Sequence, residues 1–214
     1  MDPAKPREDI ELRRMRYRLT DDQIRSIIDH ADALGGAAYA HRNRVVLRLL
    51  AVLGLRVSEL VGLNVTSIKV AGESSELRVD GKGGRVRVLQ VPRSLAQDIW
   101  TLQSIQKGRG PVGRQGSPRP LILSRRNARL SRSAINRIVA AAAEAAGVQS
   151  PSDDHRQVWP HLFRHSLAKR LKANGVDDGV IQRILGHKRR STTTEIYQAP
   201  AQQEIAEALE QGAI

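Results

Sequence analysis

The spacing of apolar residues changes twice along this chain, and these changes limit the folds that are open to it. Between Ile24 and Leu53, apolar residues recur three and four positions apart, which is the period of an α-helix. Between residues 68 and 91 the apolar runs are short and in part alternate with polar residues, which is typical of β-strands. Helical spacing returns after residue 94. The sequence therefore predicts an α+β fold that is mainly α-helical, with a small antiparallel three-stranded sheet.

Local signals indicate where the helices begin and end. A capping-box pattern at Thr20 predicts a first helix that runs to Gly35-Gly36. A second helix is expected to stop at Gly54, and Ser58 is expected to cap a short third helix. Arg56 therefore falls at a helix–helix junction. Further helices are predicted near residues 94–106, from 131 through an alanine run, and over 160–174, 177–185 and 192–197.

The β-like runs are expected to form a hairpin with a short neighbouring strand. The three runs cover residues 68–70, 77–79 and 85–88. The last run alternates arginine and valine, which fits a strand with one face in water. A glycine-rich turn over residues 81–84 precedes it and carries Lys82 at its tip.

Composition limits the classes of partner and chemistry. The 214 residues, 40% of them apolar, suffice for a core in one large domain or two small ones. Lys and Arg number 35 against 22 acidic residues, and the formal net charge of +13 indicates a polyanionic partner. The absence of cysteine excludes disulfides, thiolate nucleophiles and cysteine-based zinc sites. The polar N-terminus has no signal-peptide pattern, and no apolar run approaches the roughly 18 residues of a membrane span, so a cytoplasmic protein without membrane contact is expected.

One segment concentrates the positive charge. Residues 99–143 contain nine basic residues and no acidic one. A charge run is often only a solvated face, but the length and single sign of this one favour a track for a nucleic-acid backbone. The DNA-binding candidates within it are Arg125, Arg126, Arg129 and Arg132.

The last third of the chain holds candidates for chemistry. His161 and Arg164 are three positions apart in a predicted helix, so both project from one face and can address one phosphate. His187 follows Gly186, which ends the next predicted helix. Tyr197 lies ten residues later in a polar, threonine-rich setting, which argues against a place in the core.

Four short motifs place these residues in a common context. They are Gly54-Leu55-Arg56-Val57-Ser58-Glu59-Leu60, His161-Leu162-Phe163-Arg164-His165, Leu185-Gly186-His187 and Thr193-Thr194-Glu195-Ile196-Tyr197. In order and spacing they resemble the catalytic domain of the tyrosine recombinase (phage integrase) family over about residues 20–200. Each motif alone is weak, but four in sequence, with a lysine hairpin between the first two, argue strongly against chance agreement.

The resemblance implies a site-specific DNA recombinase or integrase. Such an enzyme cleaves and rejoins double-stranded DNA through a 3′-phosphotyrosine intermediate and a Holliday junction, without metal, ATP or other cofactor. Tyr197 would attack the phosphorus, while Arg56 and Arg164 would neutralise the non-bridging oxygens. Lys82 would protonate the departing 5′ oxygen.

The same resemblance implies supporting roles for other residues. His161 would assist proton movement at the nucleophile, and His187 would donate a hydrogen bond to the phosphate. Glu59 would orient the active-site groups rather than transfer protons. His165 is expected to be structural. The additional basic residues after the Leu-Gly-His motif, which indicate stronger DNA backbone binding, are Lys188, Arg189 and Arg190.

Other functions are weighed against this one. A type IB topoisomerase would use very similar groups to nick and reseal one duplex, and a non-catalytic DNA-binding regulator would need only the positive charge. Zinc held by His161, His165 and His187 has an acceptable spacing, but the Glu that a metalloprotease has after its first His is missing. A metal-dependent nuclease would need clustered carboxylates, whereas Asp153-Asp154 and Asp177-Asp178 fit a loop and a helix start. No metal is therefore expected.

Three segments are expected along the chain. They are a basic flexible arm over residues 1–18, the catalytic domain over 19–200 and a tail helix over 201–214. Most family members have a further N-terminal helical domain, so the chain is interpreted as a naturally minimal recombinase, which Met1 favours, or as a catalytic fragment. The resemblance implies a monomer in solution and a tetramer on DNA, helped by accessory DNA-bending proteins or a partner recombinase. The apolar stripe of residues 202–209 would then pack into a neighbouring subunit, with packing in cis as the alternative.

Overall fold

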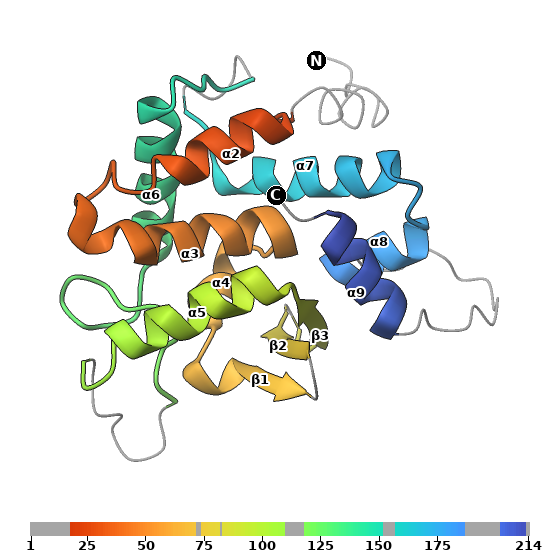
Figure 1. Ribbon diagram of the computed structural model, residues 1–214, viewed down its shortest axis with the longest axis horizontal. Helices are drawn as coiled ribbons and strands as arrows, with labels where there is room; N and C mark the ends of the chain where they lie inside the picture. The colour runs from red at the N-terminus through yellow and green to blue at the C-terminus, as the bar shows by residue number, and fades with distance from the viewer. Residues whose placement is uncertain are drawn as a thin grey trace, which may run out of the picture.

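The computed structural model describes residues 18–71, 74–81, 83–109, 118–151, 157–186 and 202–212. The helices within these ranges are α2 (Asp21–Asp29), α3 (Ala37–Leu53), α4 (Val57–Gly62), the 3₁₀ turn η1 (Val65–Ser67), α5 (Arg93–Ile105), α6 (Arg132–Ala145), α7 (Pro160–Ala173), α8 (Asp178–Leu185) and α9 (Gln202–Gln211). The strands are β1 (Ile68–Ala71), β2 (Ser74–Asp80) and β3 (Val86–Val91). The fold is thus mainly helical with one small sheet, as predicted (Figure 1).

Helix α3 forms the centre of the fold. Every residue from Leu49 to Leu53 is fully buried, and Val45, Val46 and Leu47 are buried as well. A helix segment that buries most of its side chains needs neighbours on most of its sides. Helices α2, α5, α6 and α7 provide this cover (Figure 1).

The antiparallel sheet has the strand order β1-β2-β3 and packs one face against the helices. On this face Leu77 and Val79 of β2 pair with Leu89 and Arg87 of β3. The Arg87 side chain is only 11% exposed, whereas Val86 on the other face is 48% exposed. The strand alternates as predicted, but Val86 rather than Arg87 is the residue that faces water.

Several predicted helix starts are confirmed. Thr20 makes both hydrogen bonds of the capping box with Gln23. Ser131 caps α6 by accepting a hydrogen bond from the amide of Ala134, and Pro160 is the first residue of α7. These signals are local, which is why the sequence alone reveals them. The helix predicted over residues 192–197 lies outside the described residues.

One predicted helix end and one predicted helix start are wrong. Helix α2 ends at Asp29 and does not reach Gly35, because a turn follows it. The carbonyl oxygens of Ala31 and Leu34 in this turn accept hydrogen bonds of 2.8 and 2.9 Å from the Asn43 side chain. The N-cap of α4 is Arg56 and not Ser58. The reason is the carboxylate of Glu59, which accepts a 2.8 Å hydrogen bond from the Arg56 amide.

The tail helix α9 lies against β3 and α8 of the same chain. Its apolar stripe is buried there, with Ile205, Ala208 and Leu209 each at most 3% exposed. Arg170 of α7 donates a 2.8 Å hydrogen bond to the carbonyl of Gly212 just after the helix. None of the helices in the described ranges is long and apolar enough to cross a membrane.

Candidate active site

The first motif lies where α3, α7 and α8 meet. Gly54, the C-cap of α3, has φ of 58°, in the left-handed region that favours glycine. A Cβ atom at this position would lie 2.8 Å from side-chain carbons of both Leu167 and Leu185. The close approach of α7 and α8 to the end of α3 therefore requires glycine at residue 54.

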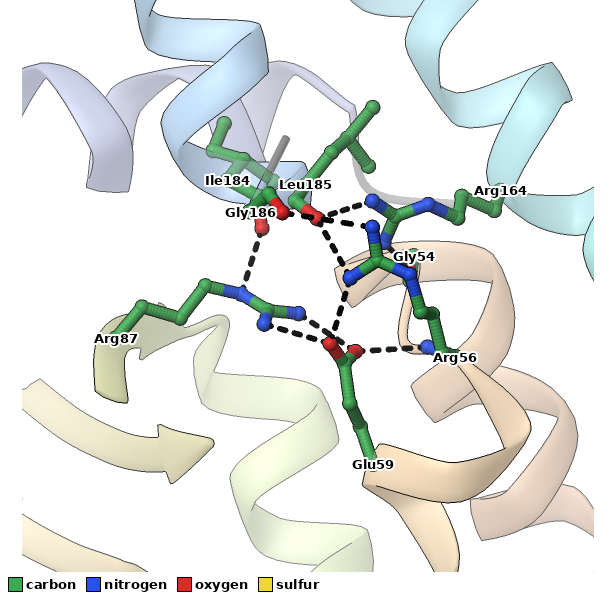
Figure 2. Close-up of polar contacts among 8 residues, drawn as sticks. All are labelled: Gly54, Arg56, Glu59, Arg87, Arg164, Ile184, Leu185 and Gly186. Atoms are coloured by element: carbon green, nitrogen blue, oxygen red, sulfur yellow. Dashed lines mark hydrogen bonds and ion pairs between the residues drawn. The ribbon is translucent and has the colours of Figure 1, made fainter. Parts of the chain in front are cut away.

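Arg164 extends from α7 into this junction and is 2% exposed. Its guanidinium donates a 2.6 Å hydrogen bond to the carbonyl of Gly54 and another to the carbonyl of Leu185 (Figure 2). Burial, followed by the charge of Arg56, lowers the pKa of Arg164 to about 9. In the described part of the chain its hydrogen bonds thus go to carbonyl groups and not to a carboxylate.

Glu59 lies on α4 and joins Arg56 to Arg87. Its Oε1 accepts hydrogen bonds of 2.9 Å from Nη1 of both arginines. Its Oε2 accepts hydrogen bonds of 2.8 Å from the Arg56 amide and from Nη2 of Arg87. Burial alone would raise the pKa of Glu59, but the hydrogen bonds from Arg87 and Arg56 outweigh it and lower the pKa to about 2. The carboxylate is therefore ionised at neutral pH and is the acceptor in all four of these hydrogen bonds.

The three arginines also bind the C-terminal end of α8 (Figure 2). Arg87 donates through Nε to the carbonyl of Ile184 at 3.0 Å, and Arg164 donates to that of Leu185. Arg56 makes longer contacts of 3.5 and 3.4 Å with the carbonyls of Leu185 and Gly186. The last carbonyl groups of a helix lack partners within it and carry partial negative charge, so cations are favoured there. Leu185 and Gly186 of the Leu-Gly-His motif thus contact the arginines through their carbonyl oxygens.

The balance of charge at this site is positive. Three guanidinium groups converge there, and two of them, those of Arg56 and Arg87, pair with the carboxylate of Glu59, while that of Arg164 donates to carbonyl groups. Arg56 and Arg164 share the carbonyl oxygen of Leu185, which brings two like charges together. The Arg56 side chain is 34% exposed and can be reached from solvent. Such a site is suited to an anion with several oxygens, such as a phosphate.

Arg87 is the site residue that the sequence analysis did not identify. The sequence pattern places it only in an alternating strand, and none of the four motifs contains it. Its position relative to Lys82, five residues earlier and across a glycine-rich turn, was the one available signal. Strand alternation alone cannot tell which face is buried, so this signal was ambiguous.

The two histidines of the second motif lie side by side on α7. The rings of His161 and His165 meet edge to face, with 4.7 Å between their centroids. His161 is exposed, while His165 is half-buried. In the described residues, no group of three or more His, Asp or Glu side chains is arranged to hold a metal ion.

Several candidate residues lie outside the described residues, namely Lys82, His187, Lys188, Arg189, Arg190 and Tyr197. The described residues next to Lys82 and His187, which are Gly81 and Gly186, lie at the site. A Cβ atom on Gly81 would be 3.8 Å from Oε1 of Glu59, and one on Gly186 would be 3.1 Å from Nη1 of Arg87. The chain therefore enters the lysine turn and leaves α8 beside the same carboxylate–arginine pair.

The four basic residues from Arg125 to Arg132, which lead into and begin α6, have different surroundings. Arg125, Arg126 and Arg132 are exposed, and the guanidinium of Arg125 lies 5.0 Å from the centre of the Tyr39 ring. Arg129 instead binds the end of α4. It donates through Nη1 to the carbonyls of Val61 at 2.7 Å and Leu63 at 3.0 Å, and through Nη2 to the Asn64 side chain at 2.6 Å.

Comparisons with known proteins place this geometry in context. The model of the phage integrase family matches residues 17–204. Tyrosine recombinase XerD of Mycobacterium tuberculosis (strain ATCC 25618 / H37Rv) is 36% identical over 188 residues, which cover 86% of this chain and 57% of that protein. Tyrosine recombinase XerA of Pyrococcus horikoshii is 33% identical over 195 residues, covering 90% of this chain and 60% of that protein. The chain thus spans less than two thirds of the length of these relatives.

Solved structures show the same fold. The crystal structure of XerA recombinase aligns with a TM-score of 0.64 at 22% identity, over 91% of this chain and 63% of that one. The XerH site-specific recombinase bound to difH substrate, a pre-cleavage complex, aligns with a TM-score of 0.68 at 18% identity, over 81% and 47% of the two chains.

Proposed function

This chain belongs to the phage integrase family, and from that membership we propose that it is a site-specific DNA recombinase. It would cleave and rejoin double-stranded DNA through a 3′-phosphotyrosine intermediate and a Holliday junction, with neither metal nor ATP. The observation that carries the proposal is the convergence of Arg56 and Arg164 on one oxygen atom beside an ionised Glu59. A tight cluster of guanidinium groups with excess positive charge matches the need of a phosphoryl transfer without metal.

In the proposed cleavage step, the hydroxyl oxygen of Tyr197 attacks a DNA phosphorus. A bond forms between this oxygen and phosphorus, and the bond between phosphorus and the 5′ oxygen breaks. Lys82 donates a proton to the departing 5′ oxygen, and His161 assists removal of the tyrosine proton. Rejoining reverses the step with a 5′ hydroxyl as the nucleophile, so the bond energy is conserved in the phosphotyrosine.

The arginines would stabilise the charge that develops on the non-bridging oxygens. Arg56 reaches solvent and can approach the phosphate directly. Arg164 donates to the carbonyls of Gly54 and Leu185 in the free protein, and it would bind a phosphate oxygen through a further N–H group or by exchanging one of these partners. His187 would donate a further hydrogen bond to the phosphate.

The proposed assembly is a monomer in solution that forms a tetramer on two DNA sites. Exposed Arg125, Arg126 and Arg132, and the basic residues 188–190, would contact the DNA backbone. Accessory DNA-bending proteins or a partner recombinase would take part, and the protein would act in the cytoplasm, where its substrate lies. The α9 helix, which packs in cis here, would move to a neighbouring subunit in the assembly.

The test is capture of the covalent intermediate. A pool of nicked suicide duplexes with random sequence around the nick is incubated with the 214-residue chain and with Tyr197→Phe. Once the strand is cut, the short end diffuses away and traps the protein on the DNA. A protein–DNA band that survives denaturing electrophoresis with the wild type and is absent with Tyr197→Phe is the expected result.

Recombination is then separated from relaxation with the captured sequence. Exchange of strands between two duplexes that carry it is expected, whereas relaxation of one supercoiled duplex without exchange indicates a topoisomerase. Absence of a covalent band across the pool contradicts the proposal and favours a DNA-binding protein without catalytic activity.

A further inference from the structure

We infer that Arg87 is a positioning residue of the proposed recombination site. Its side chain holds Glu59 and the C-terminal end of α8 in fixed positions relative to each other. Through these two contacts it sets the position of Arg56 and of the chain that leads into His187. The inference rests on the proposed function and adds to it a residue outside the four motifs.

The geometry of Arg87 is that of a bridge between three elements. From β3 its two terminal nitrogens bind both oxygens of Glu59, at 2.9 and 2.8 Å. Its Nε binds the carbonyl of Ile184 in α8 at 3.0 Å. A bidentate guanidinium–carboxylate pair fixes orientation as well as distance, because two parallel hydrogen bonds leave little freedom to rotate. Figure 2 shows Arg87 reaching Glu59 and α8 from the opposite side to Arg56 and Arg164.

Burial separates the role of Arg87 from those of the other arginines. Its side chain is 11% exposed, against 34% for Arg56, and its three guanidinium nitrogens all donate to protein acceptors. Arg56 and Arg164 can exchange carbonyl partners for a phosphate. Arg87 can keep its contacts when they do so, and it then remains as a direct connection between β3, α4 and α8.

Two glycines show how tightly the motifs pack around this arginine. Gly186, the last described residue before His187, has φ of 63°, and a Cβ there would lie 3.1 Å from Nη1 of Arg87. Gly81, the residue before Lys82, donates a 2.6 Å hydrogen bond to the carbonyl of Arg85 near the start of β3. A Cβ atom on Gly81 would lie 3.9 Å from Nη1 of Arg87. The segments that lead into Lys82 and His187 thus both border Arg87.

Electrostatics supports the same role. The hydrogen bond from Arg87 is the largest influence that opposes the effect of burial on Glu59, and it keeps the pKa of this carboxyl low. Without Arg87 the buried carboxylate would lose two of its four hydrogen bonds. Lysine at residue 87 would keep the charge, but a single ammonium group cannot reproduce the planar bidentate pair and the bond to Ile184 together.

The experiment measures cleavage separately from DNA binding. Arg87→Met, Arg87→Lys and the control Arg78→Met are compared with the wild type on the nicked duplex captured above. Arg78 lies on the neighbouring strand, with an exposed ion pair to Asp80, so its loss removes the same charge without touching the site. We expect Arg87→Met to form the covalent complex about 100-fold more slowly at saturating protein, with an unchanged Kd for the duplex. Arg87→Lys should be intermediate, and Arg78→Met should match the wild type.

Two further measurements distinguish positioning from general destabilisation. In a double-mutant cycle, Arg87→Met should cost much less in a Glu59→Gln background, because part of its effect passes through Glu59. In the protein without DNA, the amides of α8 should exchange hydrogen faster in Arg87→Met than in the wild type or Arg78→Met.

Defined results would overturn the inference. The first is a folded Arg87→Lys or Arg87→Met that cleaves at the wild-type rate, and the second is a loss of DNA affinity as large as the loss of cleavage rate. The others are additive effects of Arg87→Met and Glu59→Gln in the double-mutant cycle, or an unchanged rate of hydrogen exchange in α8. If Arg87→Met does not fold, Arg87→Lys provides the same comparison. If the wild type itself forms no covalent complex, the proposed function fails, and hydrogen exchange still decides whether Arg87 holds α8.

Discussion

At the scale of single residues, one carboxylate organises the site. Glu59 is 4% exposed and receives four hydrogen bonds from two arginines. Its pKa in the fold is about 2, below the ordinary value of 4.5. A carboxyl group whose pKa falls on folding stabilises the fold above its unfolded pKa, and this contribution is lost as the pH falls through the folded value.

Replacement of Glu59 by glutamine should therefore have a pH-dependent effect on stability. We expect Glu59→Gln to lower the free energy of unfolding by about 3 kcal/mol at pH 7, because a buried ion pair is broken. The difference from the wild type should shrink as the pH falls from about 4.5 towards 2, as the wild-type carboxylate becomes protonated. Urea unfolding at a series of pH values measures this difference. Asp80→Asn, at an exposed ion pair, should differ from the wild type by less than about 1 kcal/mol, and a pH-independent difference for Glu59→Gln contradicts the prediction.

At the scale of secondary-structure elements, arginine side chains bind the C-terminal carbonyl groups of two short helices. Helix α4 has six residues and α8 has eight, too few to be stable in isolation. Arg129 binds the end of α4, and Arg56, Arg87 and Arg164 bind the end of α8. Some of the arginines that give this chain its positive charge thus stabilise the fold.

Loss of Arg129 should consequently affect stability more than DNA affinity. Arg129→Met removes hydrogen bonds from a charged group to the carbonyls of Val61 and Leu63, and should lower the free energy of unfolding by about 2 kcal/mol. The exposed neighbour Arg126→Met should change it by less than about 0.5 kcal/mol. Denaturant unfolding and DNA binding by anisotropy are measured on both variants. A stable Arg129→Met with weakened DNA binding would instead identify Arg129 as a backbone contact, as the sequence analysis expected.

At the scale of the whole molecule, the net charge of +13 should make DNA binding depend strongly on salt. Arg125 and Arg126 are exposed on the segment between α5 and α6. If both contact phosphates, the double variant Arg125→Gln/Arg126→Gln should reduce the slope of log K against log salt by about 2. The control Arg25→Gln/Arg78→Gln alters two exposed arginines that are ion-paired to Asp22 and Asp80. Binding isotherms at several salt concentrations should show the slope change in the first variant only, and equal slopes in both would remove these arginines from the proposed DNA contacts.

The sequence by itself determined the fold class, the hairpin, most helix starts and the group of Arg56, Glu59 and Arg164 as candidates. The fold class, the hairpin and the helix starts follow from local signals, since caps and periodicity act over a few residues, whereas the candidate residues follow from the resemblance of the four motifs to a known family. Only the tertiary structure decided that Arg87 faces inward to Glu59, that Arg129 binds the end of α4, and that α9 packs on its own chain. A strand pattern with period two is equally consistent with either face being buried, and an arginine side chain reaches partners that are distant in sequence. Which carboxylate or carbonyl group it meets is therefore set by how the helices and the sheet pack together.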